Sequence, residues 1–400
     1  MEILNIKRFN KYASSIFWVG ITEATIVVIN GVIALFLAHR FRPEIFSQYI
    51  VITTAVTSLA LITRGIQSSV AHKIATVRNV HINDGRSGQS GIGITFKLGL
   101  TLCTMWVAIS PIFSIITRIG LLPILAATPI ILSSTFGSLV SGYLQGNSKF
   151  HILRISILLS TSIQLPIVIA LALLKAPISA FILSLCIPSV LYATAFIRSK
   201  QFRKIVAQVE IKLGLLSGFL LLILTMGLQM PLIFARNELS HSEIGPITFL
   251  LFTLGVMVSV SSNLGSYLLP GYKAAKPHTT SFHMQIRHGV HAILIPGFAC
   301  FYLLLNLSPF TAFLGSDYFY DVIPSYFYYC IFSFTIWSLL KSVVEERLAH
   351  LSLNSVLIAS TLAICEIILL YFTNLNLSSY FVIHAIVGLS NLLAILLTAK

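Results

Sequence analysis

The sequence predicts an all-α integral membrane protein, with twelve transmembrane helices in two six-helix bundles, residues 1–204 and 205–400. The first observation behind this prediction is composition, because 56% of the residues are hydrophobic and only 10% are charged. Soluble domains carry about 25% charged residues. A chain with so few charges cannot coat a soluble fold of this size, so it must offer apolar surface to lipid.

The second observation is the length of the apolar runs. A helix needs about 20 apolar residues to cross roughly 30 Å of hydrocarbon. The loops between the runs are too short to fold as separate domains. The runs that meet the length rule are residues 14–38, 45–69, 92–116, 120–144, 152–174, 177–197, 213–235, 244–270, 289–308, 322–344, 351–373 and 379–399.

The third observation is an internal repeat. Residues 40–73 form a charged elbow followed by a long apolar run with a basic end, and residues 239–273 follow the same plan. Glu44 corresponds to Glu243, which is an offset of 199 residues in a chain of 400. Six spans in each half make the two repeats parallel. They are expected to be related by an axis along the membrane normal, with a cavity between them.

The distribution of Lys and Arg predicts the orientation, because cytosolic loops are enriched in them. With the N-terminus in the cytosol, nineteen of the 26 basic residues fall in cytosolic segments and five in outer loops. This asymmetry predicts a multi-pass protein of the cytoplasmic (inner) membrane with both termini in the cytosol. It also accounts for most of the net charge of +14, so no nucleic-acid partner is needed; the basic run 198–212 suits anionic membrane lipids.

Two carboxylates lie inside predicted spans. Glu23 lies about 15 Å from the cytosolic end of the first span, near the polar side chain of Asn30, and Glu366 lies in the eleventh span among apolar neighbours. A carboxylate at this depth usually faces a cavity or a partner. Glu23 is therefore a candidate for binding a substrate hydroxyl or a coupling ion, and Glu366 for a coupling ion. The alternative for each is a protonated or hydrogen-bonded group that joins helices.

Basic residues inside or beside the spans are candidates for binding an anionic headgroup. Arg64 and Lys97 lie in the second and third spans, towards the cytosolic side, and a guanidinium pairs well with phosphate oxygens. Either side chain could instead extend to the cytosolic interface. Arg118 and Arg236, in outer loops, could receive the same charge at the other end of the path.

Seven aromatic residues crowd the start of the tenth span. We expect an aromatic belt at the membrane interface, with sugar stacking as the less favoured alternative. The residues are Tyr318, Phe319, Tyr320, Tyr326, Phe327, Tyr328 and Tyr329.

Signals for an enzyme or a cofactor are absent from the sequence. No nucleophile elbow, phosphate-binding loop or zinc-protease motif occurs. His288 and His291 have a spacing that a metal would accept on a helix, but no Cys or carboxylate joins them nearby. We therefore expect no catalytic residues, no metal site and no cofactor.

Four short motifs resemble those of the polysaccharide flippases. Residues 38–49, AHRFRPEIFSQY, resemble the elbow between their first two spans, although Phe41-Arg42-Pro43 stands where Leu-Gly-Pro is usual. Residues 66–75, IQSSVAHKIA, and 142–150, GYLQGNSKF, are similar to their turns after spans two and four, and 313–318, FLGSDY, to the turn before span ten. Their order along twelve spans carries the resemblance.

The resemblance implies a member of the multidrug/oligosaccharidyl-lipid/polysaccharide exporter superfamily, with its two bundles forming a V around a central cavity. It implies a flippase that moves an isoprenoid-diphosphate-linked oligosaccharide from the cytosolic to the outer leaflet by alternating access, for O-antigen or capsule assembly. Its implied partners are this lipid-linked glycan, membrane lipids, and polysaccharide polymerase and chain-length regulator proteins. The alternative is a cation- or proton-coupled multidrug antiporter on the same fold.

Overall fold

A computed structural model of the chain describes part of its 400 residues, and every structural statement below concerns that part. The described residues are 22, 25–26, 28–77, 91–147, 149–197, 218–219, 222, 231–233, 239, 243–255, 297, 315–319, 324–349, 361, 364 and 376–397.

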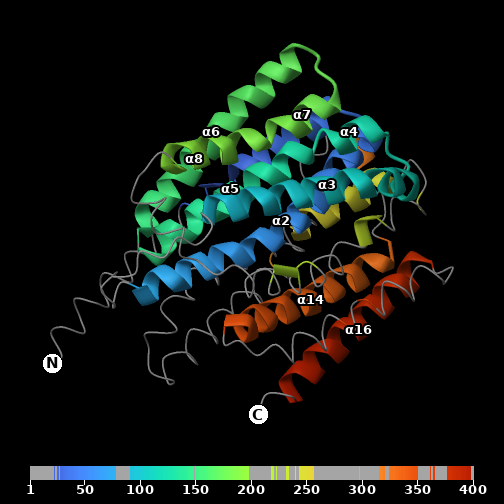
Figure 1. The fold of residues 1–400 in the computed structure, drawn as a ribbon. Helices are drawn as coiled ribbons and strands as arrows, with labels where there is room; N and C mark the ends of the chain where they lie inside the picture. Colours follow the sequence, from blue (N-terminus) through green and yellow to red (C-terminus); the bar gives the residue numbers. More distant parts are fainter. Residues whose placement is uncertain are drawn as a thin grey trace. The chain divides into compact units, whose positions relative to one another are not determined.

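The described elements are all helical, which confirms the all-α membrane fold (Figure 1). Two of the helical stretches used below are Val28–Arg40 and Glu243–Gly255. The remaining elements are α2 (Pro43–Val77), α3 (Gly91–Thr117), α4 (Leu121–Leu125), α5 (Thr128–Gly146), α6 (Phe150–Leu173), α7 (Ile178–Ser184), α8 (Cys186–Ile197), the 3-10 turn η1 (Ser316–Tyr318), α14 (Tyr326–Ala349) and α16 (Leu377–Leu397).

Two predicted spans are each divided into two helices, and proline explains both breaks. The run 120–144 becomes α4 and α5, and the run 177–197 becomes α7 and α8. A proline ring collides with the carbonyl four residues earlier and cannot donate to it. Four residues before Pro129 is Leu125, where α4 ends, and four residues before Pro188 is Ser184, where α7 ends.

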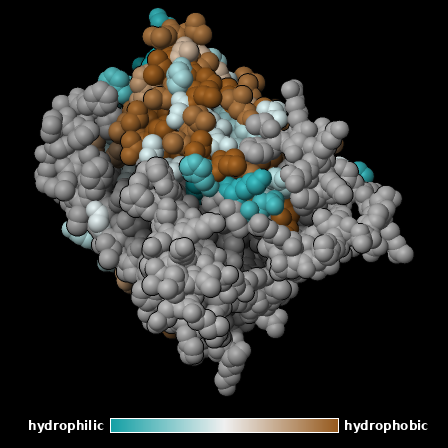
Figure 2. Space-filling model, turned by 90° about the vertical axis from the view of Figure 1, so that its left-hand side faces the viewer, coloured by the Kyte–Doolittle hydropathy of each residue, from teal (hydrophilic) through white to brown (hydrophobic). Residues whose placement is uncertain are grey.

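The outer surfaces of α3 and α6 are apolar, as expected for helices that face lipid. Ile112 and Ile115 on α3, and Leu159 and Leu173 on α6, are more than half exposed. Figure 2 shows mostly brown, apolar atoms on the described part of one face, with paler and hydrophilic groups among them. Both helices are long and apolar enough to cross a membrane, as are the segments 121–146 and 377–394.

Hydroxyl side chains on these helices are satisfied within the helix. Thr101 and Thr104 on α3 donate to the carbonyls of Lys97 and Leu100, at 2.9 Å in each case. A hydroxyl that bonds its own backbone can face hydrocarbon without an unpaired polar group. Exposed Thr on α3 is therefore compatible with a lipid-facing surface.

The chain packs as two compact units. The first contains residues 1–34, 63–109 and 125–215, and the second contains 35–62, 110–124 and 216–400. In the first unit α5, α6 and α8 pack against one another, and in the second α14 packs along α16 (Figure 1). Both α2 and α3 contribute to the two units. The division at residue 204 describes the sequence repeat and stays a prediction.

Candidate functional site

The C-terminal half of α2 packs closely against α5 because two glycines remove the side chains between them. A Cβ added to Gly142 would lie 2.5 Å from the carbonyl oxygen of Gln67 and 2.9 Å from the Cβ of Val70. A Cβ added to Gly146 would lie 2.8 Å from the carbonyl oxygen of Ala71. Gly142 and Gly146 form the G-x-x-x-G spacing that lets membrane helices approach at backbone distance.

Polar side chains join the same two helices beside the glycines. The hydroxyls of Thr63 and Ser138 are 2.7 Å apart, and Gln67 Nε2 donates to Gln145 Oε1 at 3.1 Å. Hydrogen bonds between membrane helices help hold them together, because hydrocarbon offers no other partner. We call these residues, with Gly142 and Gly146, the α2–α5 seam.

Of the predicted site residues, Arg64 lies closest along the chain to the seam. It follows Thr63 on α2, and only its backbone position belongs to the description. Lys97 lies nearly two turns inside the N-terminus of α3 and is exposed. The cation of Lys97 is thus accessible from outside the protein, as a headgroup-binding residue requires, and the same exposure suits a side chain that extends to the interface.

The other predicted site residues are placed in part. Asn30 is exposed on the helical stretch Val28–Arg40, and Arg118 is exposed in the turn after α3. Glu23, Arg236 and Glu366 lie outside the described residues. Their proposed contacts with a headgroup or a coupling ion stay predictions.

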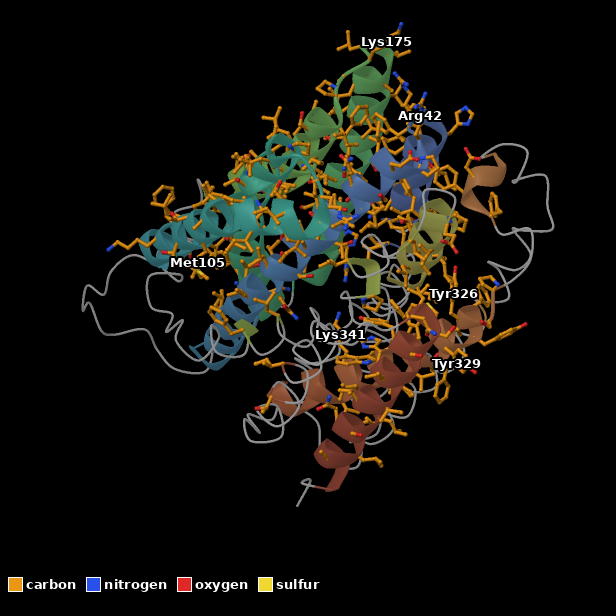
Figure 3. All side chains as sticks on the ribbon, turned by 90° about the vertical axis from the view of Figure 1, so that its right-hand side faces the viewer. Arg42, Met105, Lys175, Tyr326, Tyr329 and Lys341 are labelled. Atoms are coloured by element: carbon orange, nitrogen blue, oxygen red, sulfur yellow. The ribbon has the colours of Figure 1, made fainter. Side chains whose placement is uncertain are left out.

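Two basic residues at helix ends adopt the left-handed conformation that normally favours glycine. Arg118 after α3 has φ 53°, and Lys175 after α6 has φ 54°. At Lys175 the geometry is a Schellman cap, with Lys175 N–H donating to the carbonyl of Ala172 and Ala176 N–H to that of Leu171. Figure 3 shows Lys175 at the tip of this helix end. A left-handed L-residue costs roughly 1–2 kcal/mol.

Two buried basic residues were assigned by the sequence prediction to the cytosolic loop charge. Arg154 on α6 is 2% exposed and Lys341 on α14 is 8% exposed. Both lie within a few turns of a predicted cytosolic boundary, so they were counted among the basic residues of the cytosolic segments. Because both side chains are buried, they belong to the interiors of the helix bundles. A helix with polar residues on one face and apolar residues on the opposite face is the sequence pattern that could have predicted this burial.

At the predicted outer side, the elbow before α2 contacts the segment that precedes α14. Tyr318 is 1% exposed, and its hydroxyl donates to the carbonyl oxygen of Phe41 at 3.0 Å. The ring of Phe46 meets that of Tyr318 edge-on, with centroids 5.7 Å apart. Burial raises the pKa of the Tyr318 hydroxyl, and the negative charges of Asp317 and Glu44 add to the increase.

Gly245 brings the second copy of the repeat to the same place. A Cβ on Gly245 would collide with the carbonyl oxygen of Asp317 and lie 3.1 Å from the Cβ of Pro43. Glu44 lies in the first turn of α2, where a carboxylate is stabilised by the helix dipole, and Glu243 lies in the helical stretch Glu243–Gly255. Both copies of the sequence repeat therefore contain helix beside the segment around Tyr318.

The prediction of a single aromatic belt is wrong for part of the cluster. Tyr318, Phe319 and Phe327 are buried, and the ring of Phe319 packs edge-on against that of Phe249, 5.9 Å between centroids. Only Tyr328 and Tyr329 among the described members are exposed large aromatic groups. Packing beside the elbow before α2 accounts for the burial of Tyr318 and Phe319.

A metal centre finds no support in the described ranges, which contain no group of three His, Cys, Asp or Glu side chains able to hold an ion. His288 and His291, which have the spacing of a metal pair but were not expected to bind a metal, lie outside those ranges. The described site residues offer charge at the exposed Lys97 and hydrogen bonding at the amides of Gln67 and Gln145.

Solved multidrug and toxin extrusion (MATE) transporters share this fold. The structure of a eukaryotic MATE transporter, AtDTX14, matches with a TM-score of 0.69 and 11% identity over 98% of this chain and 97% of that one. An outward-facing MATE transporter of the MOP superfamily matches at 0.55 with 14% identity, over 96% and 93%. An inward-facing one matches at 0.53 with 10% identity, over 95% and 100%. No protein-family model and no curated protein matches the sequence.

Proposed function

We propose that this protein is an alternating-access transporter that exports an amphipathic substrate across the cytoplasmic membrane. The observation that carries the proposal is the match of nearly the whole chain to the MATE fold, which has been solved in both inward-facing and outward-facing conformations. A change between inward-facing and outward-facing conformations needs rigid helices that connect the two membrane surfaces. The 35 residues of α2 form a helix roughly 50 Å long that joins the outer elbow to the α2–α5 seam.

Two substrate classes have support. The descriptions of the structural neighbours name multidrug resistance transporters, and this supports a cation- or proton-coupled multidrug antiporter more directly than a flippase. The four motifs support a lipid-linked oligosaccharide flippase instead. So do the buried cations Arg154 and Lys341, because a buried basic side chain favours an anionic diphosphate over an organic cation.

Reconstitution with two probes distinguishes the classes. Vesicles containing the purified protein are given either a fluorescent glycan on an isoprenyl diphosphate or the cationic dye ethidium, and movement between leaflets or across the membrane is followed. A flippase accelerates transfer of the diphosphate probe only. A multidrug antiporter moves ethidium against a proton or sodium gradient and leaves the diphosphate probe at the rate of protein-free vesicles.

Lys97 provides the variant for this assay, because it is exposed and its loss leaves no buried gap. If the substrate is the diphosphate, Lys97→Ala lowers transfer severalfold while Lys149→Ala, which removes another exposed basic residue, has a smaller effect. Failure of both probes to move in vesicles with correctly inserted protein would reject the transport proposal as a whole.

A further inference from the structure

The interface between α14 and α16 buries a stripe of polar and aromatic side chains that the site above does not use. The members recur at spacings of four or seven residues, so each helix presents them on one face. Each side chain is at most 8% exposed. The members are Ser333, Trp337 and Lys341 on α14, and Tyr380, His384 and Asn391 on α16.

His384 lies between two aromatic rings. Its imidazole stacks on the indole of Trp337, with centroids 4.7 Å apart and planes at 14°, and on the ring of Tyr380 at 5.9 Å and 27°. Trp337 Nε1 donates to the carbonyl oxygen of His384 at 2.8 Å. A Cβ on Gly388 would lie 2.8 Å from that same nitrogen, so glycine leaves room for the indole.

This arrangement suits a group that gains a proton. The faces of aromatic rings carry negative potential and stabilise a cation placed over them, and an imidazole is the side chain whose charge changes between about pH 5 and 8. A neutral aromatic residue would fill the same volume without this ability. The two rings thus solvate an imidazolium where hydrocarbon would not.

Polar groups on the same stripe point to entry of a small polar species. The amide nitrogen and oxygen of Asn391 and the hydroxyl of Ser333 are buried, and they hydrogen-bond to none of the residues that the structure describes. An unpaired buried amide is destabilising, and ionisable or polar groups inside membrane bundles commonly mark ion or proton routes. In Figure 3, Lys341 lies in the body of the pair, away from the end that carries Tyr326 and Tyr329.

We propose that His384 is a proton-binding site within the α14–α16 pair, with Trp337 and Tyr380 as the groups that stabilise its charged form. The proton adds to an imidazole nitrogen and no other bond changes. The titratable groups that share the stripe are Tyr380 and Lys341, and Lys341 opposes the new charge. Two acids of α14, Glu345 and Glu346, lie about two turns beyond Trp337.

Fluorescence of Trp337 tests the proposal without any substrate. The chain contains three tryptophans, so Trp18→Phe with Trp106→Phe leaves Trp337 as the only one. A protonated imidazole accepts an electron from an excited indole more readily than a neutral one, so stacking on an imidazolium quenches the emission. We expect the emission to fall in a single transition as the pH is lowered.

His384→Gln in this background is expected to abolish the transition, whereas His151→Gln, which removes an exposed histidine of α6, retains it. If His384→Gln is not recovered in the membrane, His384→Phe keeps a ring against Trp337 and replaces it. Emission that does not change with pH in the parent, or a transition that persists without His384, overturns the proposal. Neither result bears on which substrate is carried, since no substrate is present.

Discussion

At the residue scale, close approach of α2 and α5 depends on the two glycines of the sequence GYLQG. Because neither glycine has a Cβ, the backbone carbonyls of Gln67 and Ala71 on α2 can lie directly against the backbone of α5. Gly137 lies on a different face of α5, and the atom nearest to a Cβ added there is the Cβ of Ser189, 3.9 Å away. The motif taken from the sequence as a family resemblance is thus explained locally by packing, whatever the substrate.

Gly142→Ala should therefore destabilise the protein, because its methyl group would force the two backbones apart. Overpacking of this kind costs about 1–3 kcal/mol. Thermal unfolding of the purified protein in detergent measures the effect. The matched control is Gly137→Ala on the same helix, which should be neutral or slightly stabilising because alanine favours a helix by up to about 1 kcal/mol. Equal stability of the two variants would contradict this account.

At the scale of elements, the outer elbow is held by one buried tyrosine and the rings around it. Tyr318 reaches the carbonyl of Phe41 across 277 residues of sequence, and the rings of Phe46 and Phe249 both meet it edge-on. Edge-on aromatic pairs contribute about 0.5–1.5 kcal/mol each beyond burial. The contact therefore joins the first repeat to the second through packing that neither repeat contains alone.

The raised pKa of Tyr318 predicts how this contact responds to alkali. A phenol whose pKa is higher in the folded state stabilises the fold fully below its ordinary pKa of 10.0, and that contribution is lost as the pH rises above it. We expect the difference in tyrosinate absorbance near pH 10 between the unfolded and the folded protein to be smaller by one group in Tyr318→Phe than in the parent.

The same variant has a second expected effect. Loss of the hydroxyl leaves the Phe41 carbonyl without this donor, at a cost of about 1 kcal/mol in unfolding free energy. Tyr329→Phe is the control, because Tyr329 is exposed. Titration of Tyr318 near its ordinary pKa of 10.0 in the folded protein would contradict its burial in the elbow before α2.

At the scale of the whole molecule, the charge asymmetry predicts which face is outside. Lys149 and Lys175 lie at opposite ends of α6 and are both exposed. In a background without the five native cysteines, Lys175→Cys should react with an impermeant maleimide added to intact cells, and Lys149→Cys only after the membrane is opened. The reverse pattern would show that the topology is opposite to the predicted one. Reaction of both cysteines from outside would show that α6 does not cross the membrane.

The sequence by itself determined the class of the protein and most helix positions, because lipid imposes a length and a composition on each span that a linear pattern carries directly. It also determined the repeat, whose first copy contains α2 and whose second copy contains the helical stretch Glu243–Gly255. Tertiary structure decided what one-dimensional patterns cannot hold: the breaks of α4 from α5 and of α7 from α8, where the proline effect depends on helix context, and the burial of Tyr318, Arg154 and Lys341. Above all, it brought Trp337 against His384, because contacts between helices depend on which faces meet in three dimensions.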